Sequence, residues 1–269
     1  MIRSMYSGIS GLKNFQTKLD VIGNNIANVN TYGFKKGRTV FKDLYSQTVA
    51  GASEPGANRG GVNPKQVGLG SQLATIDTIH SGGSMQTTGN TLDLAIEGDG
   101  FFVVEDGTQK FYTRAGNFYL DAGDGTGEAS LVDGDGRYVL NSDESHITIP
   151  ITATSLSIGQ DGKVVFVNAD GELDERGQVA VAKFNNSGGL TKIGGNLYQE
   201  SANSGAPSDL LTPLEEGRGA IRSGSLEMSN VDLSEEFTEM IVAQRGFQAN
   251  TRIITTSDEI LQELVNLKR

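Results

Sequence analysis

The chain has 269 residues, a formal net charge of −11, 36 glycines and no cysteine. The acidic balance argues against a surface for nucleic acid or anionic lipid, and the lack of cysteine excludes disulfides, thiolate chemistry and cysteine-based zinc sites. No stretch approaches ~18 apolar residues, so we expect no membrane insertion, and the first residues lack the apolar region of a cleaved signal peptide.

The first expected element is an amphipathic helix over residues 2–26, because apolar side chains recur there at three- and four-residue spacing and no proline interrupts them. Its apolar stripe includes Ile9, Leu12, Leu19 and Ile26. The sequence Asn30-Thr31-Tyr32-Gly33 marks the exit, where Gly33 can take the left-handed conformation that ends many helices.

Asparagines gather where this helix is expected to end, at Asn24, Asn25 and Asn28. One interpretation is that they fray the helix end, because the asparagine amide competes with the backbone for hydrogen bonds. The other is that they fix the register of crowded helices, since an amide both donates and accepts hydrogen bonds without a charge to desolvate. We favour the second interpretation, in which these residues serve subunit assembly.

Residues 39–89 are expected to form an extended arm or linker. Within them, residues 46–75 are rich in Gly, Ser, Gln and Asn with little periodicity, which predicts a long loop or an extended arm. Residues 90–215 are expected to form an all-β domain, because short β-branched and aromatic runs alternate with Asp-Gly turns at ~8–12-residue spacing. Residues 216–231 then form a return linker.

We expect no catalytic, metal or cofactor site. The only two histidines, His80 and His146, are far apart in the sequence and have no ligand-like spacing. The acidic, glycine-rich segment around residue 133 fails the calcium-loop template, because Arg137 and Tyr138 stand where a ligand and a glycine are needed. Hairpin turns explain it better, and no nucleophile-and-base motif or phosphate-binding loop was found.

The last expected element is a helix over residues 234–267, within a C-terminal segment of residues 232–269. Apolar residues follow a strict four-three alternation there. They include Phe237, Met240, Phe247, Ile254 and Leu261. Asp232, with Glu235 three residues on, has the form of a capping box.

The two helical ends are expected to pair. Residues 1–38 are mainly basic and residues 232–269 mainly acidic, and both carry apolar stripes. The fold class is therefore α+β, with paired, coiled-coil-like terminal helices that carry the central all-β domain. Because the two stripes exceed what a single helix pair can cover, the surplus predicts contacts with other copies of the chain.

Several segments resemble the bacterial flagellar rod and hook protein family. They are "LDVIGNNIANVNTYGFKKGR" (residues 19–38), "TLDLAIEGDGFFVV" (91–104), "YTRAGNFYLD" (112–121) and the C-terminal segment that starts "GSLEMSNVDLSEEF" at residue 224. They occur in the family's order over nearly the whole chain.

The resemblance implies a structural subunit, not an enzyme, which self-assembles into a hollow helical tube. The tube would be the distal rod or the hook, and it would transmit torque and leave an export channel. Implied partners are further copies of the chain, the neighbouring axial proteins of the rod, hook and hook–filament junction, and the flagellar type III export apparatus. Export without a cleaved signal peptide is implied too. The alternative from the residues alone is a secreted β-domain that binds a ligand, with the helices as an oligomerisation stalk.

Overall fold

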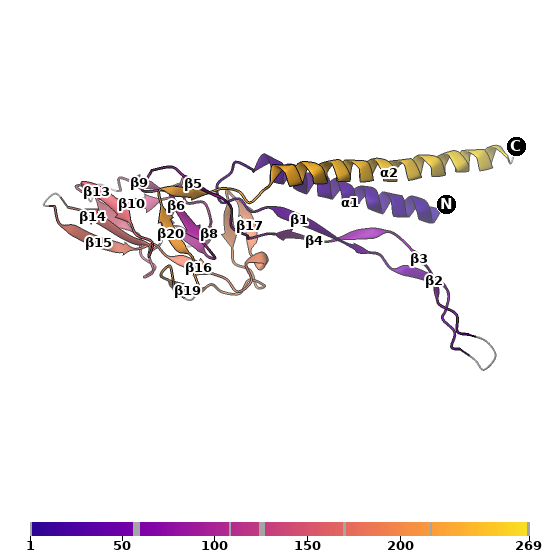
Figure 1. Ribbon diagram of the computed structural model, residues 1–269, viewed down its shortest axis with the longest axis horizontal. Coiled ribbons are helices and arrows are strands. Elements are labelled where there is room, and N and C mark those ends of the chain that lie inside the picture. The colour runs from indigo at the N-terminus through magenta and orange to yellow at the C-terminus, as the bar shows by residue number, and fades with distance from the viewer. Residues whose placement is uncertain are drawn as a thin grey trace. The chain divides into compact units, whose positions relative to one another are not determined.

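The computed structural model describes residues 2–55, 60–107, 109–123, 127–168, 171–215 and 217–267. It has a helix at each end of the chain and strands between them, the predicted order of elements (Figure 1). The chain forms two compact units: unit 1 is Met1–Ala27, Gly37–Thr78 and Asp232–Arg269, and unit 2 is Asn28–Lys36 and Ile79–Val231. Within the described residues, the helices are too short or too polar to cross a membrane.

Unit 1 contains the two helices, α1 (Ile2–Ala27) and α2 (Leu233–Asn266), which pack against each other. The predicted spans agree with these bounds to within a residue. The side chain of Asp232 caps α2 by accepting hydrogen bonds from the backbone N–H groups of Ser234 and Glu235, as the capping sequence predicted. At 34 residues, α2 is about 50 Å long.

Unit 1 also contains two pairs of antiparallel strands. The strands β1 (Gly37–Asp43) and β4 (Ser71–Thr78) pair, and so do β2 (Ser46–Ala50) and β3 (Lys65–Gly68). The sequence predicted a long loop or an extended arm over residues 46–75, and the structure has paired strands in place of a loop. The strands were missed because the side chains of β2 and β3 are exposed on both faces, so no apolar alternation marks them.

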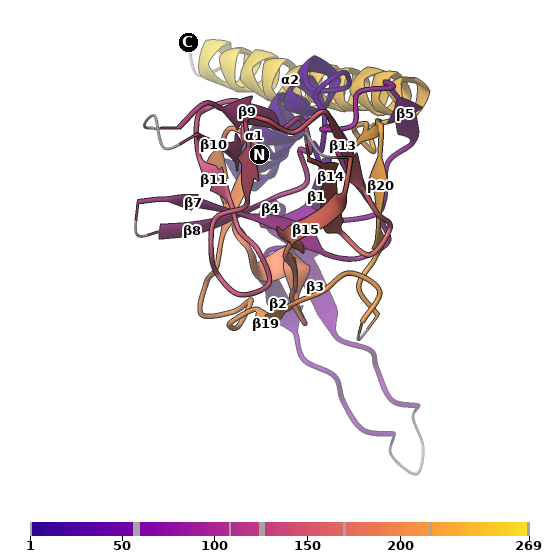
Figure 2. The ribbon, with the colours of Figure 1, turned by 90° about the vertical axis from the view of Figure 1, so that its left-hand side faces the viewer.

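Unit 2 is all-β, as predicted for residues 90–215, and it also has two strands within residues 216–231, where a return linker was expected (Figure 2). Its strands are β5 (Met85–Thr87), β6 (Leu94–Glu97), β7 (Phe101–Asp106), β8 (Gln109–Thr113), β9 (Tyr119–Asp121), β10 (Glu128–Val132), β11 (Tyr138–Val139), β12 (Thr148–Pro150), β13 (Ser155–Ile158), β14 (Lys163–Val167), β15 (Leu173–Gln178), β16 (Val181–Lys183), β17 (Thr191–Gly194), β18 (Leu197–Gln199), β19 (Ser208–Leu211), β20 (Ala220–Ser223) and β21 (Ser225–Glu227). A short 3₁₀ helix, Ser187–Gly189, precedes β17.

The main sheet has the strand order β12-β10-β11-β7-β8-β18-β17, with β9 on β10, β16 on β7 and β19 on β16. A second sheet has the order β13-β14-β15, and β20 pairs with β6 and β21 with β5. In the turn between β10 and β11, Arg137 forms ion pairs with Asp133 at 2.9 Å and Asp135 at 2.7 Å. These acidic residues therefore belong to a hairpin turn, as predicted.

The strand β7 is buried on both faces, which explains its unbroken apolar run. Phe102 and Val104 lie in one apolar cluster. The alternate residues, Phe101 and Val103, lie in another. A strand covered on both sides has no need of polar alternation.

A buried ion cluster lies in unit 2. Lys35 Nζ lies 2.6 Å from Glu227 Oε1 and donates to the carbonyl of Ser81 at 2.8 Å. Arg114 Nη1 lies 3.2 Å from Glu227 Oε2. The backbone N–H of Gly33 donates to the carbonyl of Glu227 at 2.8 Å. The cluster therefore ties together segments that are far apart in the sequence.

Candidate assembly site on the terminal helices

The two helices approach each other closely at glycines. A Cβ atom added at Gly246 would lie 2.5 Å from Cζ of Phe15, and one added at Gly11 would lie 2.9 Å from the side chain of Asn250. Such distances are far below van der Waals contact, so a larger side chain at either position requires the Phe15 ring or the Asn250 amide to shift, or the helices to move apart. Glycine at these two positions sets the spacing of α1 and α2.

The covered side of α2 carries small and polar side chains at seven-residue spacing. Its members are Glu236, Ala243, Asn250 and Ser257, all buried or half-buried. Lys18 of α1 forms an ion pair with Glu239 of α2. Small and polar groups therefore form part of the contact between the helices of one chain, together with Phe15, which faces Gly246, and Ile254, which faces Gly8.

Asn25 links three segments of unit 1. Its side chain is almost fully buried, with 1% relative exposure for the residue. Its Oδ1 accepts from the backbone N–H of Gly37 at 2.9 Å, and its Nδ2 donates to the carbonyl of Gly37 at 2.9 Å and to Oε2 of Glu236 at 3.2 Å. A side chain that both donates and accepts is required here, so the amide joins α1 to the start of β1 and the first turns of α2.

The other two asparagines have different surroundings. Asn24 is exposed on α1, and Asn28 lies just beyond the helix, half-buried. Asn28 Oδ1 accepts from the hydroxyl of Thr31 at 3.2 Å, and its carbonyl accepts from the backbone N–H of Thr31 at 3.1 Å. Asn28 therefore stabilises the turn that follows α1.

Gly33 has the left-handed conformation that was expected, with φ of 67°, but it does not cap the helix. The helix ends six residues earlier, at Ala27, because residues 28–30 form a turn. A Cβ atom at Gly33 would lie 2.5 Å from the backbone nitrogen of Ala115. Gly33 is required by the close packing of two backbone segments of unit 2.

The predicted apolar residues are mostly offset by one position in the sequence from the residues that are covered where α1 packs against α2. On α1, Ile9 is exposed, and Leu12, Leu19 and Ile26 are half-buried. On α2, Phe237 and Phe247 are exposed, and Met240, Ile254 and Leu261 are half-buried. The structure therefore does not confirm a coiled-coil seam between the two helices of one chain, although Ile254 faces Gly8 of α1, and the predicted positions remain partly exposed.

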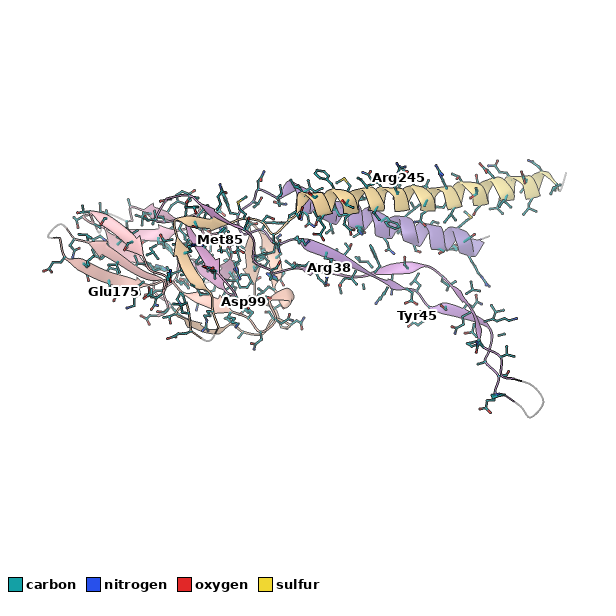
Figure 3. All side chains as sticks on the ribbon, in the orientation of Figure 1. Arg38, Tyr45, Met85, Asp99, Glu175 and Arg245 are labelled. Atoms are coloured by element: carbon teal, nitrogen blue, oxygen red, sulfur yellow. The ribbon has the colours of Figure 1, made fainter. Side chains whose placement is uncertain are left out.

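Large apolar side chains of α2 remain exposed. We call them together the apolar face of α2, which consists of two stripes: Phe237 and Ile241 on one, and Val242, Ile253, Ile260 and Leu264 on the other. Ile241, for example, is 59% exposed. Arg245, one turn after Ile241 and therefore on the same side of α2, lies on the side that is turned away from α1 (Figure 3).

The ribbon formed by β2 and β3 is a second exposed apolar surface. Tyr45 is 92% exposed, and Val49 and Val67 are exposed on the two strands (Figure 3). An isolated two-stranded ribbon is marginally stable at best in water, so exposed apolar side chains on it indicate a further contact surface.

Two features of the site were missed from the sequence. The seven-residue spacing of small and polar residues on α2 is visible in the sequence, but apolar periodicity alone does not mark it. The buried cluster of Lys35, Arg114 and Glu227 had no sequence signal, because its members are far apart in the chain.

The chain matches three descriptions of flagellar protein families: "Flagella basal body rod protein" over residues 5–35, "Flagellar hook protein FlgE/F/G D1 domain" over residues 95–166, and "Flagellar basal body rod FlgEFG protein C-terminal" over residues 222–267. It is 64% identical to the flagellar basal-body rod protein FlgG of Bacillus subtilis over 269 residues, which covers both chains completely. The chain belongs to the flagellar rod and hook protein family.

Other members of the rod and hook family are similar over their full lengths. FlgG of Borreliella burgdorferi is 41% identical over 276 residues, and the flagellar hook protein FlgE of the same organism is 33% identical over 442 residues, each match covering both chains completely. The chain is a structural rod or hook subunit of the flagellum and not an enzyme, as the sequence predicted.

Proposed function

We propose that copies of this chain assemble into a hollow helical tube, which transmits torque from the motor to the filament and leaves a central export channel. The observation that carries the proposal is the exposed apolar face of α2. Covering the exposed half of one aliphatic side chain is worth about 1 kcal/mol, so contacts of this face with a second copy would stabilise a polymer.

We infer that the tube is the distal rod and not the hook. The B. subtilis rod protein has the same aligned length as this chain and 64% identity, whereas the B. burgdorferi hook protein is 33% identical over a much longer alignment of 442 residues. Electron microscopy of cells that lack the protein tests this inference. Structures that stop at a short rod support it, and a complete rod that lacks only the curved hook contradicts it.

In this proposal, the helical parts 1–38 and 232–269 form the wall around the channel. Their partly exposed positions contact neighbouring copies, and Asn24 and Asn28 help to fix the register between copies. The partners are the chain itself and the neighbouring axial proteins of the rod, hook and hook–filament junction. The opposite charge balance of the two helical ends supports contacts between copies as well as within one.

The proposal includes export of the subunit through the flagellar type III apparatus without a cleaved signal peptide. Family membership supports this part. Mass spectrometry of subunits from purified basal bodies tests it. An N-terminal peptide that includes Ile2 is expected, and its replacement by a peptide that starts tens of residues later would contradict the absence of cleavage.

Assembly is tested with Ile241→Asp, which places a carboxylate in the apolar face of α2. The matched control is Thr238→Asp, which adds the same group one turn earlier at an exposed polar position whose hydroxyl bonds only within its own helix, to the carbonyl of Ser234 at 2.8 Å. Because Ile241 is exposed in the single chain, both variants should fold normally. Ile241→Asp should fail to build rods and abolish motility, and Thr238→Asp should assemble. Normal rods from Ile241→Asp would contradict the role of this face.

The alternative of a ligand-binding β-domain on an oligomerisation stalk finds no support in the family to which the chain belongs.

A further inference from the structure

The helix α2 is longer than α1, and its C-terminal end extends past the N-terminal end of its partner (Figure 1). The two helices are antiparallel, and Gly8 of α1 faces Ile254 of α2. Because α1 begins at Ile2, six residues before Gly8, it reaches to about residue 260 of α2. We call residues 260–266 the α2 overhang, since they extend beyond the first described residue of α1.

The stripe of α2 that faces α1 changes its character in the α2 overhang. Beside α1 it has small or polar residues at every seventh position, which are Glu236, Ala243, Asn250 and Ser257. The next position in this series is Leu264, which is 49% exposed. Ile260 and Val265 are exposed as well. Large apolar side chains therefore gather where α1 no longer covers the stripe, and covering them would stabilise a contact with another molecule.

The α2 overhang also carries negative charge. Glu259, at its start, and Glu263 are one turn apart, so their carboxylates lie on one side of the helix, next to Ile260 and Leu264. The C-terminal end of a helix adds a partial negative charge. The two basic residues at positions 268 and 269 lie outside the described residues. One side of the overhang thus combines two carboxylates with two large apolar side chains.

The helix α1 has an exposed surface with the opposite charge. Tyr6 is 67% exposed and Ile9 is 38% exposed, and the exposed side chains of Arg3 and Lys13 lie about one turn before and after them. The spacing of three or four residues places all four along one side of α1, which we call the basic face of α1. Residues 2–19 contain three basic residues and no acidic one. The basic face therefore matches the overhang both in apolar character and in charge.

We propose that the α2 overhang of one copy packs against the basic face of α1 of a second copy. The apolar side chains of the two surfaces cover each other, and the carboxylates of the overhang lie near Arg3 and Lys13. This inference rests on the proposed assembly into a polymer and adds which surfaces meet. Because the two surfaces differ, the contact is head-to-tail and can repeat without closing, as a helical polymer requires.

The chain has no cysteine, so a pair of introduced cysteines tests the contact directly. The variant Tyr6→Cys/Leu264→Cys places one thiol on each surface, at positions that are exposed in the single chain. Since Gly8 faces Ile254, the two positions of one chain are separated along the helices by about eight residues, or ~12 Å. A disulfide usually needs Cα atoms within about 7 Å, so this one can form only between copies.

The measurement is the size of disulfide-linked chains from purified, oxidised basal bodies. The variant is expressed together with the wild-type chain, so that rods form even where the substitutions impair assembly. We expect linked oligomers from Tyr6→Cys/Leu264→Cys. The matched control is Asp20→Cys/Leu264→Cys, whose first thiol lies about 21 Å further along α1 and should form no such link.

Two results would overturn this contact while the proposed tube remains. One is rods that contain Tyr6→Cys/Leu264→Cys chains without linked oligomers. The other is an equal yield of linked dimers from Leu264→Cys alone, which would show that two overhangs meet each other. Basal bodies that lack the chain altogether would instead contradict the proposed function.

A charge exchange tests the match between the two surfaces. Adding Lys13→Glu to the cysteine pair should lower the yield of linked oligomers about threefold, because like charges would then face each other. Adding Glu263→Lys as well should restore the yield. Lys110→Glu, which makes the same charge change at an exposed position of β8 in unit 2, is the control and should leave the yield unchanged. Equal losses from Lys13→Glu and Lys110→Glu would contradict the proposed pairing.

Discussion

At the scale of single residues, Asn25 has a clearer structural role than Asn24 or Asn28, the other asparagines near the end of α1. Asn25 replaces a strand partner for Gly37, because its amide makes the same donor and acceptor pair that a neighbouring backbone would make. Glutamine is the only other side chain that carries an amide, and it is one methylene longer. The sequence predicted the role of a buried amide, but it did not show which of the three residues would be buried.

Asn25→Asp should weaken this junction strongly. Aspartate cannot donate to the carbonyl of Gly37, and its carboxylate would face that of Glu236. Leaving a buried backbone group unsatisfied costs about 1–3 kcal/mol, so the backbone N–H of Gly37 should exchange with solvent at least about tenfold faster. Hydrogen exchange of the isolated chain measures this. Asn24→Asp at the exposed neighbouring position is the control, and equal exchange in both variants would contradict the assigned role.

Glu227 is the residue on which the buried ion cluster depends, because it is the carboxylate that both Lys35 and Arg114 contact. Glu227→Gln should destabilise unit 2 by about 3–5 kcal/mol, since two cations would remain buried with a neutral partner. Urea unfolding monitored by signals of unit 2 measures the change. Glu175→Gln, which removes an exposed partner of Lys163, should change stability by about 1 kcal/mol or less. A similar small change for both variants would show that the cluster is not required.

At the scale of elements, the sequence determined the helices well and their contacts less well. Both helix spans followed from apolar periodicity, but the positions that it marks are only half-buried or exposed in the single chain. The stripe that pairs α1 with α2 has glycine, alanine and polar residues, which apolar counting cannot find. The ribbon of β2 and β3 was missed for a related reason, because a strand exposed on both faces carries no alternating pattern.

Two glycine-to-alanine changes separate helix propensity from helix packing. Both Gly246 of α2 and Gly23 of α1 lie inside helices, where alanine is intrinsically favoured by up to about 1 kcal/mol. A Cβ atom at Gly23 meets nothing within 4 Å, whereas one at Gly246 collides with the ring of Phe15. Gly23→Ala should therefore stabilise the isolated chain, and Gly246→Ala should destabilise it despite the gain in propensity. Thermal unfolding measures both, and stabilisation by Gly246→Ala would show that the helices are free to move apart.

At the scale of the whole molecule, the two units differ in how completely a single chain covers them. Unit 2 has apolar clusters whose members are almost fully buried, such as Phe102 and Val104. In α2, by contrast, the buried residues are only Glu236, Ala243 and Ser257 among the residues that the structure describes. A helix held by so few covered side chains opens more readily than a closed β core, because tertiary packing supplies most of the stability of helices.

Protection of backbone amides against hydrogen exchange should therefore differ between the two units in the isolated chain and become similar in the polymer. Amides of β7 should be protected in both states, because their protection comes from the core of unit 2. Amides in the last three turns of α2 should exchange quickly in the isolated chain and become protected on assembly, as neighbouring copies cover Ile260 and Leu264. Slow exchange of these α2 amides in a chain that stays monomeric at high concentration would show that α2 is stable without a neighbour. That result would contradict the role of the apolar face of α2 in assembly.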